Sequence, residues 1–154
     1  MRASARADYH RAKVPGQTTT RRPSEPEFVS LCASCRDSGG IVGGDDLARL
    51  LEDRRIGDCA NLGRCIASGE VFGFERRGCT WIPMFQFEPL DLSTRSVLVP
   101  VVWAFGRVLD GWALALWFTR PNDLLNKLRP VDVLDSNRFG VLNAARADRL
   151  NVTG

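Results

Sequence analysis

The longest apolar stretch of the chain, Val97–Phe118, is the feature that most restricts its fold. A proline, two glycines and two charged residues interrupt it: Pro100, Gly106, Arg107, Asp110 and Gly111. Charged side chains are costly inside a bilayer, and Pro and Gly weaken a helix, so this stretch does not predict a membrane span. Apolar residues instead recur with helical spacing on either side of Asp110. We therefore expect two short buried helices and no membrane partner.

The residues after this stretch carry the signals of further short helices. Pro121 should end the second apolar helix, and a single turn is expected at Asn122–Asn126. Pro130 should begin another helix, because proline is favoured at a first helical position. The last helix should begin at Ser136 or Asn137, with Val141, Leu142 and Ala145 facing inward. Residues 91–154 are therefore predicted to form a helical domain.

The preceding segment, residues 41–90, predicts two helices and a β-hairpin. Asp45 or Asp46 is expected to cap the first helix, and the second should run over Cys59–Ser68. Strands are expected at Val71–Phe74 and Cys79–Phe87. In the second strand four residues should share one face, and its proline indicates an edge strand or a bulge: Trp81, Pro83, Phe85 and Phe87. The order helix, helix, hairpin is the outline of a small winged helix, so the predicted fold class is α+β and mainly helical.

Residues 1–40 have the composition of a disordered basic tail. They hold seven Lys/Arg and four Asp/Glu, whereas residues 41–154 hold fourteen of each. They show no apolar periodicity, so they cannot bury enough surface to offset the entropy of ordering them. The alternatives are a basic arm that contacts DNA phosphates and a translation start placed too far upstream.

Enzymatic signatures are hard to find. The one histidine, His10, lies in the predicted tail, and no phosphate-binding glycine loop or nucleophile elbow is present. Cys32 and Cys35 have the spacing of a metal or redox pair, but no second pair with zinc-ligand spacing accompanies them. Five cysteines and no signal peptide favour unpaired thiols in a reducing cytoplasm. We expect no catalytic residue, no metal and no cofactor.

Two strings of residues stand out when taken in order. The first is Trp81-Ile-Pro-Met-Phe-Gln-Phe87. The second begins at Asp110-Gly-Trp-Ala-Leu-Ala-Leu-Trp-Phe-Thr-Arg-Pro-Asn122 and continues through Pro130-Val-Asp-Val-Leu134 and Val141-Leu-Asn-Ala-Ala-Arg146. In their order and spacing these strings resemble the Xre/MbcA/ParS-type antitoxins. The resemblance runs from about Asp45 to Arg149.

This resemblance implies a function without chemistry of its own. Antitoxins of this type belong to type II toxin–antitoxin systems and bind a RES-domain toxin that degrades NAD, blocking its active site by contact. Many also bind operator DNA and regulate their own operon, and a homodimer is a further partner that such a helical domain allows. The alternative is a stand-alone DNA-binding transcriptional regulator that has lost its toxin.

The resemblance and the residue types together suggest two sets of site residues. The expected toxin-binding residues are Trp112, Arg120, Pro121, Asn122, Asn143, Arg146 and Arg149. The expected DNA-binding residues, on the second helix and at the hairpin tip, are Asn61, Arg64, Arg76 and Arg77. The remaining tryptophans, Trp81, Trp103 and Trp117, are expected in the core together with Phe118.

The chain departs from the family pattern at three positions. Lys127 stands where the family usually has Gly, and Arg129 stands where it usually has a capping Thr. Pro100 is unusual within the connecting helix. These departures leave the predicted fold intact and bear on the affinity for a toxin.

Overall fold

The computed structural model of the chain describes residues 22–153, and its elements alternate between helices and a small sheet. Its first half contains α2 (Glu25–Cys35), β1 (Ile41–Gly43), α3 (Gly44–Asp53), α4 (Cys59–Ser68), β2 (Phe74–Arg76) and β3 (Cys79–Pro83). Its second half contains α5 (Val99–Phe105), α6 (Gly111–Thr119), the short 3-10 helix η4 (Asp123–Leu125), α7 (Pro130–Val133) and α8 (Arg138–Thr153). The α+β class is confirmed. No helix among the described residues is long and apolar enough to cross a membrane.

The helix ends follow the local sequence closely. The Asp110 carboxylate accepts a hydrogen bond from the Ala113 N–H at 2.8 Å and so caps α6. Pro130 occupies the first turn of α7, and Gly140 donates its N–H to the Asn137 side chain at the start of α8. Pro100 lies in the first turn of α5, where its missing N–H costs no helical hydrogen bond.

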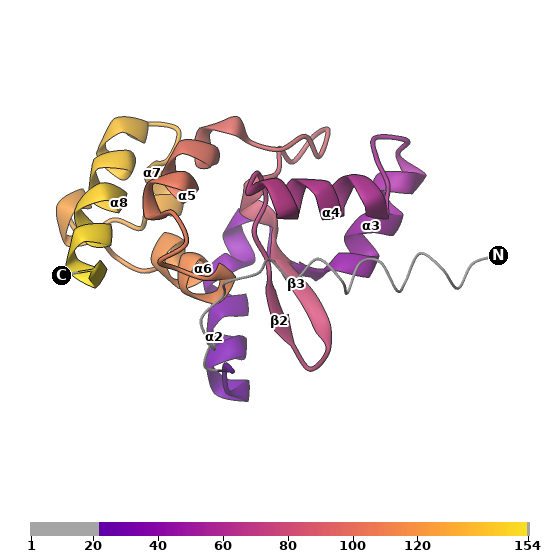
Figure 1. The fold of residues 1–154 in the computed structure, drawn as a ribbon, viewed down its shortest axis with the longest axis horizontal. Helices are drawn as coiled ribbons and strands as arrows, with labels where there is room; N and C mark the ends of the chain where they lie inside the picture. Colours follow the sequence, from indigo (N-terminus) through magenta and orange to yellow (C-terminus); the bar gives the residue numbers. More distant parts are fainter. Residues whose placement is uncertain (1–21, 154) are drawn as a thin grey trace.

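The three strands form an antiparallel sheet in the order β1–β3–β2. The turn between β2 and β3 consists of Arg77 and Gly78, both with positive φ, as a tight two-residue hairpin requires. One core lies on each side of the sheet. The first joins α2 and the sheet to α5, α6, α7 and α8, and the second joins the sheet to α3 and α4. In Figure 1, α3 and α4 stand at one end of the molecule and α8 at the other.

The two halves meet where α6 begins. A Cβ atom added to Gly111 would lie 1.8 Å from the carbonyl oxygen of Gly73, just before β2. Only glycine allows this close approach of the two backbones. Beside this contact, the rings of Trp112 and Phe74 meet edge to face, with their centroids 5.1 Å apart. The first turn of α6 is thereby fixed against the sheet.

The predicted disordered tail was wrong for the part of it that the structure describes. Helix α2 lies within residues 1–40, and its Leu31 and Cys35 are fully buried in the first core. Ser24 and Glu27 form a reciprocal capping box at its start. The α2 sequence mixes polar and apolar residues without a clear helical stripe, so its periodicity does not predict a helix. Residues 1–21 of the predicted tail lie outside the described residues.

The sheet differs from the prediction in several respects, and β2 spans Phe74–Arg76 rather than Val71–Phe74. Strand β1 was not predicted, and it makes β3 the central strand rather than an edge strand. Pro83 is tolerated because it is the last residue of β3, where the chain turns into a short 3-10 helix, Met84–Gln86. This turn also separates residues expected on one face: Trp81 and Phe85 join the first core, and Phe87 joins the second.

Two further predictions are corrected. Helix α3 begins at Gly44, with Gly43 in the capping position, so neither Asp45 nor Asp46 caps it; both lie in its first turn. Trp103 is 60% exposed rather than buried, because the inward side of α5 is filled by Val101, Val102 and Phe105. Trp81 and Trp117 are half-buried and Phe118 is fully buried.

Candidate functional site

The strongest candidate for a binding site is the outward side of the last helix, α8. The helix is held in place by small residues, since Val141, Ala144 and Ala145 are fully buried against the first core. Helix α5 is its main packing partner. Small inward side chains let α8 lie close to the core, which leaves its large side chains on the opposite side.

Four residues follow one another along this outward side. They recur at the spacing that places side chains on one face of a helix: Phe139, Asn143, Arg146 and Leu150. Phe139 is 71% exposed and Leu150 is 70% exposed, and both polar residues between them are exposed too. We call this set the α8 stripe. Two large apolar residues with an amide and a guanidinium between them form the pattern of a helix that lies in a partner's groove.

A partly buried polar contact fixes the other side of α8. One carboxylate oxygen of Asp148 accepts hydrogen bonds from the Trp117 indole N–H at 2.7 Å and from the Asn122 side-chain amide at 2.8 Å. The Asn122 side-chain oxygen accepts the Leu124 N–H at 2.9 Å and so caps η4. This contact joins α6, η4 and α8, so the α8 stripe is presented on a rigid support.

The structure separates the predicted toxin-binding residues into three groups. Asn143 and Arg146 belong to the α8 stripe. Arg120 and Pro121 are exposed at the end of α6, next to Asn122, whose side chain is used in the contact with Asp148. Trp112 lies at the opposite end of α6, packed against Phe74.

Arg149 is also partly engaged. Its guanidinium donates a hydrogen bond to the Ala104 carbonyl at 3.2 Å and lies against Gly106, at the end of α5. An arginine at this place satisfies a carbonyl that has no partner within the helix. Arg149 therefore supports the packing of α5 on α8, whereas Arg146 makes no hydrogen bond or ion pair within residues 22–153.

The predicted DNA-binding residues do not form one surface. Asn61 and Arg64 lie on α4, where the Arg64 guanidinium donates to the Asn61 side chain. Arg76 is only 10% exposed, pairs with Glu25 of α2, and lies over the Phe28 ring at 4.4 Å. It is a structural link between the hairpin and α2, so the prediction that it meets phosphate is at odds with its burial.

The charges of residues 41–90 also weigh against DNA binding by this segment. Arg77 is 75% exposed at the hairpin turn, but Glu25 lies 3.1 Å from its guanidinium. Residues 41–90 contain eight Asp/Glu and six Lys/Arg, a net charge of −2. Binding to DNA is driven by the neutralisation of phosphates, and this segment offers no excess positive charge for it. Residues 91–154 contain eight Lys/Arg and six Asp/Glu, a net charge of +2.

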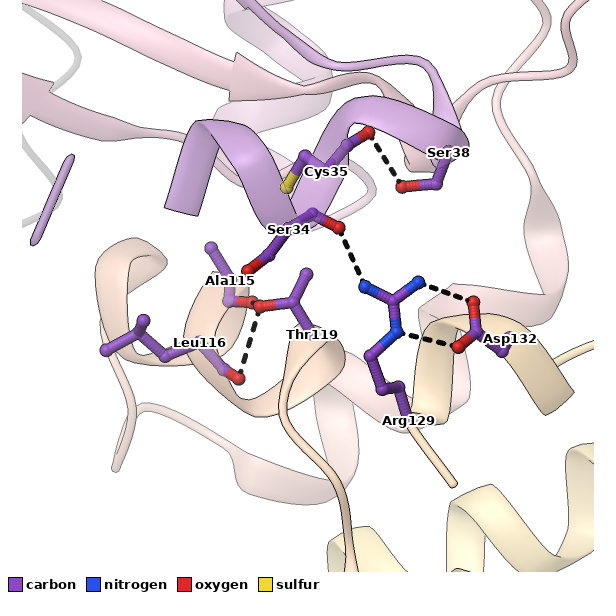
Figure 2. A network of polar contacts seen from close by, with 8 residues as sticks. All are labelled: Ser34, Cys35, Ser38, Ala115, Leu116, Thr119, Arg129 and Asp132. Carbon is purple, nitrogen blue, oxygen red and sulfur yellow. Dashed lines mark hydrogen bonds and ion pairs between the residues drawn. The ribbon is translucent and has the colours of Figure 1, made fainter. Parts of the chain in front are cut away.

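Two departures from the family pattern have clear structural settings. Lys127 has φ of +66°, so this position favours the glycine that the family usually has. Arg129 gives α7 no side-chain cap, but its guanidinium makes two hydrogen bonds to Asp132, at 2.7 and 2.8 Å. It also donates to the Ser34 carbonyl of α2 at 2.8 Å, as Figure 2 shows. Arg129 thus ties α7 to the end of α2.

Three cysteines show the character of packed thiols, Cys32, Cys35 and Cys65, whereas Cys79 is exposed. Burial raises the pKa of Cys35 to about 11, and burial also raises the pKa of Cys32 and of Cys65. A raised pKa keeps a thiol protonated and poorly reactive at neutral pH. No group of three or more metal-ligating side chains occurs within residues 22–153.

Sequence reasoning missed Phe139 and Leu150, although both stand off the inward positions of α8 and could have been placed outside by helical spacing alone. The contact between Trp117 and Asp148 carried no local signal, because 31 residues separate the partners. Comparison with protein families, with curated proteins and with solved structures finds no match for the chain.

Proposed function

We propose that this chain is a non-enzymatic antitoxin that binds a RES-domain, NAD-degrading toxin and occludes its active site. The observation that carries the proposal is the α8 stripe. The stripe exposes a phenylalanine and an arginine on one helix face, and both residue types are enriched at protein interfaces. Occlusion needs a firmly held exposed surface rather than a catalytic group, and the outward side of α8 is such a surface.

The support for α8 favours binding without a large rearrangement. Asp148 fixes the helix to α6 and η4, so little conformational freedom would be lost when a partner binds. The exposed Leu124 and Leu128 near η4 extend the apolar surface on this half of the chain. The net charge of +2 in residues 91–154 favours an acidic rim around the partner's cleft.

A DNA-binding regulator is the second candidate, because of one observation. The element order α2, β1, α3, α4, β2, β3 and the pairing of β1 with β3 resemble those of a winged helix, which supports this candidate. However, α2 packs on α6 rather than forming a bundle with α3 and α4. The net negative charge of residues 41–90 and the engaged Arg76 weigh against this candidate. Specific retention on promoter DNA at low salt would favour it.

The test co-expresses the chain with a RES-domain toxin encoded beside its gene and measures growth and cellular NAD. The double variant Phe139→Glu with Leu150→Glu and the single variant Arg146→Glu should lose protection, because each alters the α8 stripe. Each variant should keep its fold, because only exposed side chains are changed. Arg64→Glu and Leu90→Glu, on the other half of the surface, serve as matched controls. Truncation after Asp135 is less informative, since it also removes Val141, Ala144 and Ala145 from the core.

Equal protection by the stripe variants and the controls would remove α8 from the mechanism. Failure of the wild-type chain to protect, with the toxin expressed and active, would remove the antitoxin function itself. Each variant must keep the wild-type melting temperature for the comparison to count.

A further inference from the structure

A recessed surface lies in the first half of the chain, between the exposed side of α2 and the turn into β1. It encloses about 500 Å³ and is lined by Glu25, Phe28, Val29, Cys32, Ala33, Arg36, Gly39 and Gly40. We call it the α2–β1 groove. Most of its lining is apolar, and Val29 on its wall is 57% exposed. It is remote from the α8 stripe and plays no part in the proposed function.

The groove borders an open edge of the sheet. Strand β1 pairs with β3 on one side, and no strand among the described residues pairs with its other side. Met84 donates its N–H to the Gly40 carbonyl at 2.9 Å, and β1 and β3 are antiparallel. Because the direction of the backbone groups alternates along a strand, the N–H and carbonyl of Val42 point towards β3, whereas those of Ile41 point away from it. Outside the β1–β3 ladder, no hydrogen bond from residues 22–153 reaches the N–H or the carbonyl of Ile41.

The charges around the groove leave one cation unpaired. Glu25, at one end, is engaged by Arg76 and Arg77. Arg36, at the other end, is exposed and makes no ion pair within the described residues. No ion pair joins Arg36 to its sequence neighbour Asp37. The free positive charge therefore lies where the chain turns into β1.

We propose that the α2–β1 groove binds the C-terminal end of an extended partner peptide by strand addition to β1. A peptide antiparallel to β1 would pair with the N–H and carbonyl of Ile41 and place alternate side chains towards the apolar wall at Val29. Its chain would run towards the turn at Arg36–Gly40 and end there. Arg36 would bind its terminal carboxylate, and Gly40, whose Cβ position has no atom within 4 Å, leaves room for it.

The first test selects peptides on the purified full chain from a library of random sequences that end in free carboxylates. Enriched peptides should carry apolar residues at alternate positions near their C-termini. The best of them is then synthesised with a free carboxylate and with a C-terminal amide, and both are titrated against the chain. Amidation should weaken binding about tenfold or more, because it removes the partner of Arg36. The absence of any enrichment would overturn the proposal.

Variants then locate the bound peptide. Val29→Glu and Arg36→Gln should each weaken binding about tenfold. Leu90→Glu is the control for an added charge, and Arg54→Gln is the control for an arginine at a helix C-cap, since Arg54 caps α3 as Arg36 caps α2. Equal binding by the variants and their controls, or by the amide and the acid, would overturn the proposal.

Hydrogen exchange tests the strand addition directly. Peptide binding should slow exchange of the Ile41 amide and leave the amides of α8 unchanged. Protection confined to any other element would show that the peptide binds elsewhere and would contradict the proposal.

Discussion

Helices α2 and α8 stand at the two ends of the described chain, and they bury opposite kinds of residue. Helix α2 places the large Leu31 in the core and rests Phe28 against the sheet, whereas α8 buries Val141, Ala144 and Ala145 and leaves Phe139 and Leu150 outside. Of the large apolar residues of α2, Val29 alone is largely exposed, so this helix contributes mainly to stability. Helix α8 leaves two large apolar residues outside, so the comparison points to α8 rather than α2 as the helix of the proposed toxin interface.

The largest difference in stability between the two helices is expected at Leu31. Replacing it with Ala should lower the free energy of unfolding by about 3 kcal/mol, because a fully buried leucine leaves a cavity. Leu150→Ala, at a leucine that is 70% exposed, should change it by less than about 0.5 kcal/mol. Both values come from denaturant titration. Similar losses for the two variants would mean that α2 and α8 do not differ as described.

A substitution on the inward side of α8 sharpens the comparison. Ala145→Leu should lower the free energy of unfolding by about 2 kcal/mol, because Ala145 is fully buried and the larger side chain must push α8 outward. Arg146→Leu, one residue later on the outward side, is the matched control and should leave stability nearly unchanged. An unchanged melting temperature for Ala145→Leu would show that α8 packs loosely.

The contact at Asp148 gives a smaller effect on stability. Asp148→Ala should lower the free energy of unfolding by about 1.5 kcal/mol, since the half-buried Trp117 and Asn122 lose their shared acceptor. The change should also alter Trp fluorescence, because the indole N–H loses its hydrogen bond. A wild-type emission spectrum and stability would contradict the assigned contact.

The smallest predicted effect is an increase in stability. Lys127→Gly should raise the free energy of unfolding by about 0.7 kcal/mol, because glycine accepts the φ of +66° without the steric cost of a Cβ. Asn126→Gly, at φ of +55°, should give less, since asparagine tolerates this conformation better than lysine does. A loss of stability for Lys127→Gly would mean that the Lys127 side chain stabilises the turn through its contact with Asp123.

The parts of the fold that could be predicted from the sequence depend on local signals. Asp110, Pro121 and Pro130 act on neighbouring backbone groups, so the ends of α6 and α7 could be placed without knowledge of the rest. Strand β1 has three residues, and its partner β3 lies about forty residues later, so nothing local marked it. Helix α2 could not be predicted from apolar periodicity, because its sequence has no clear apolar stripe at helical spacing.

The candidate site divides in the same way. The polar positions Asn143 and Arg146 could be placed from helical spacing, and the structure leaves both exposed. The burial of Arg76 could not be foreseen, because it depends on Glu25 and Phe28 in a helix that was not expected. Gln86 is a similar case: it is buried, and its side-chain amide bonds both the N–H and the carbonyl of Phe72, fourteen residues away.

Hydrogen exchange of the full chain with and without a RES-domain toxin encoded beside its gene tests the central claim most directly. Exchange along α8 should be slower when the toxin is bound, and the toxin should lose its NAD-degrading activity in the same mixture. Amides of α3 and α4 should exchange as in the free chain. Protection of α4 and the hairpin with none in α8, or a toxin that remains fully active with the chain bound, would contradict the central claim.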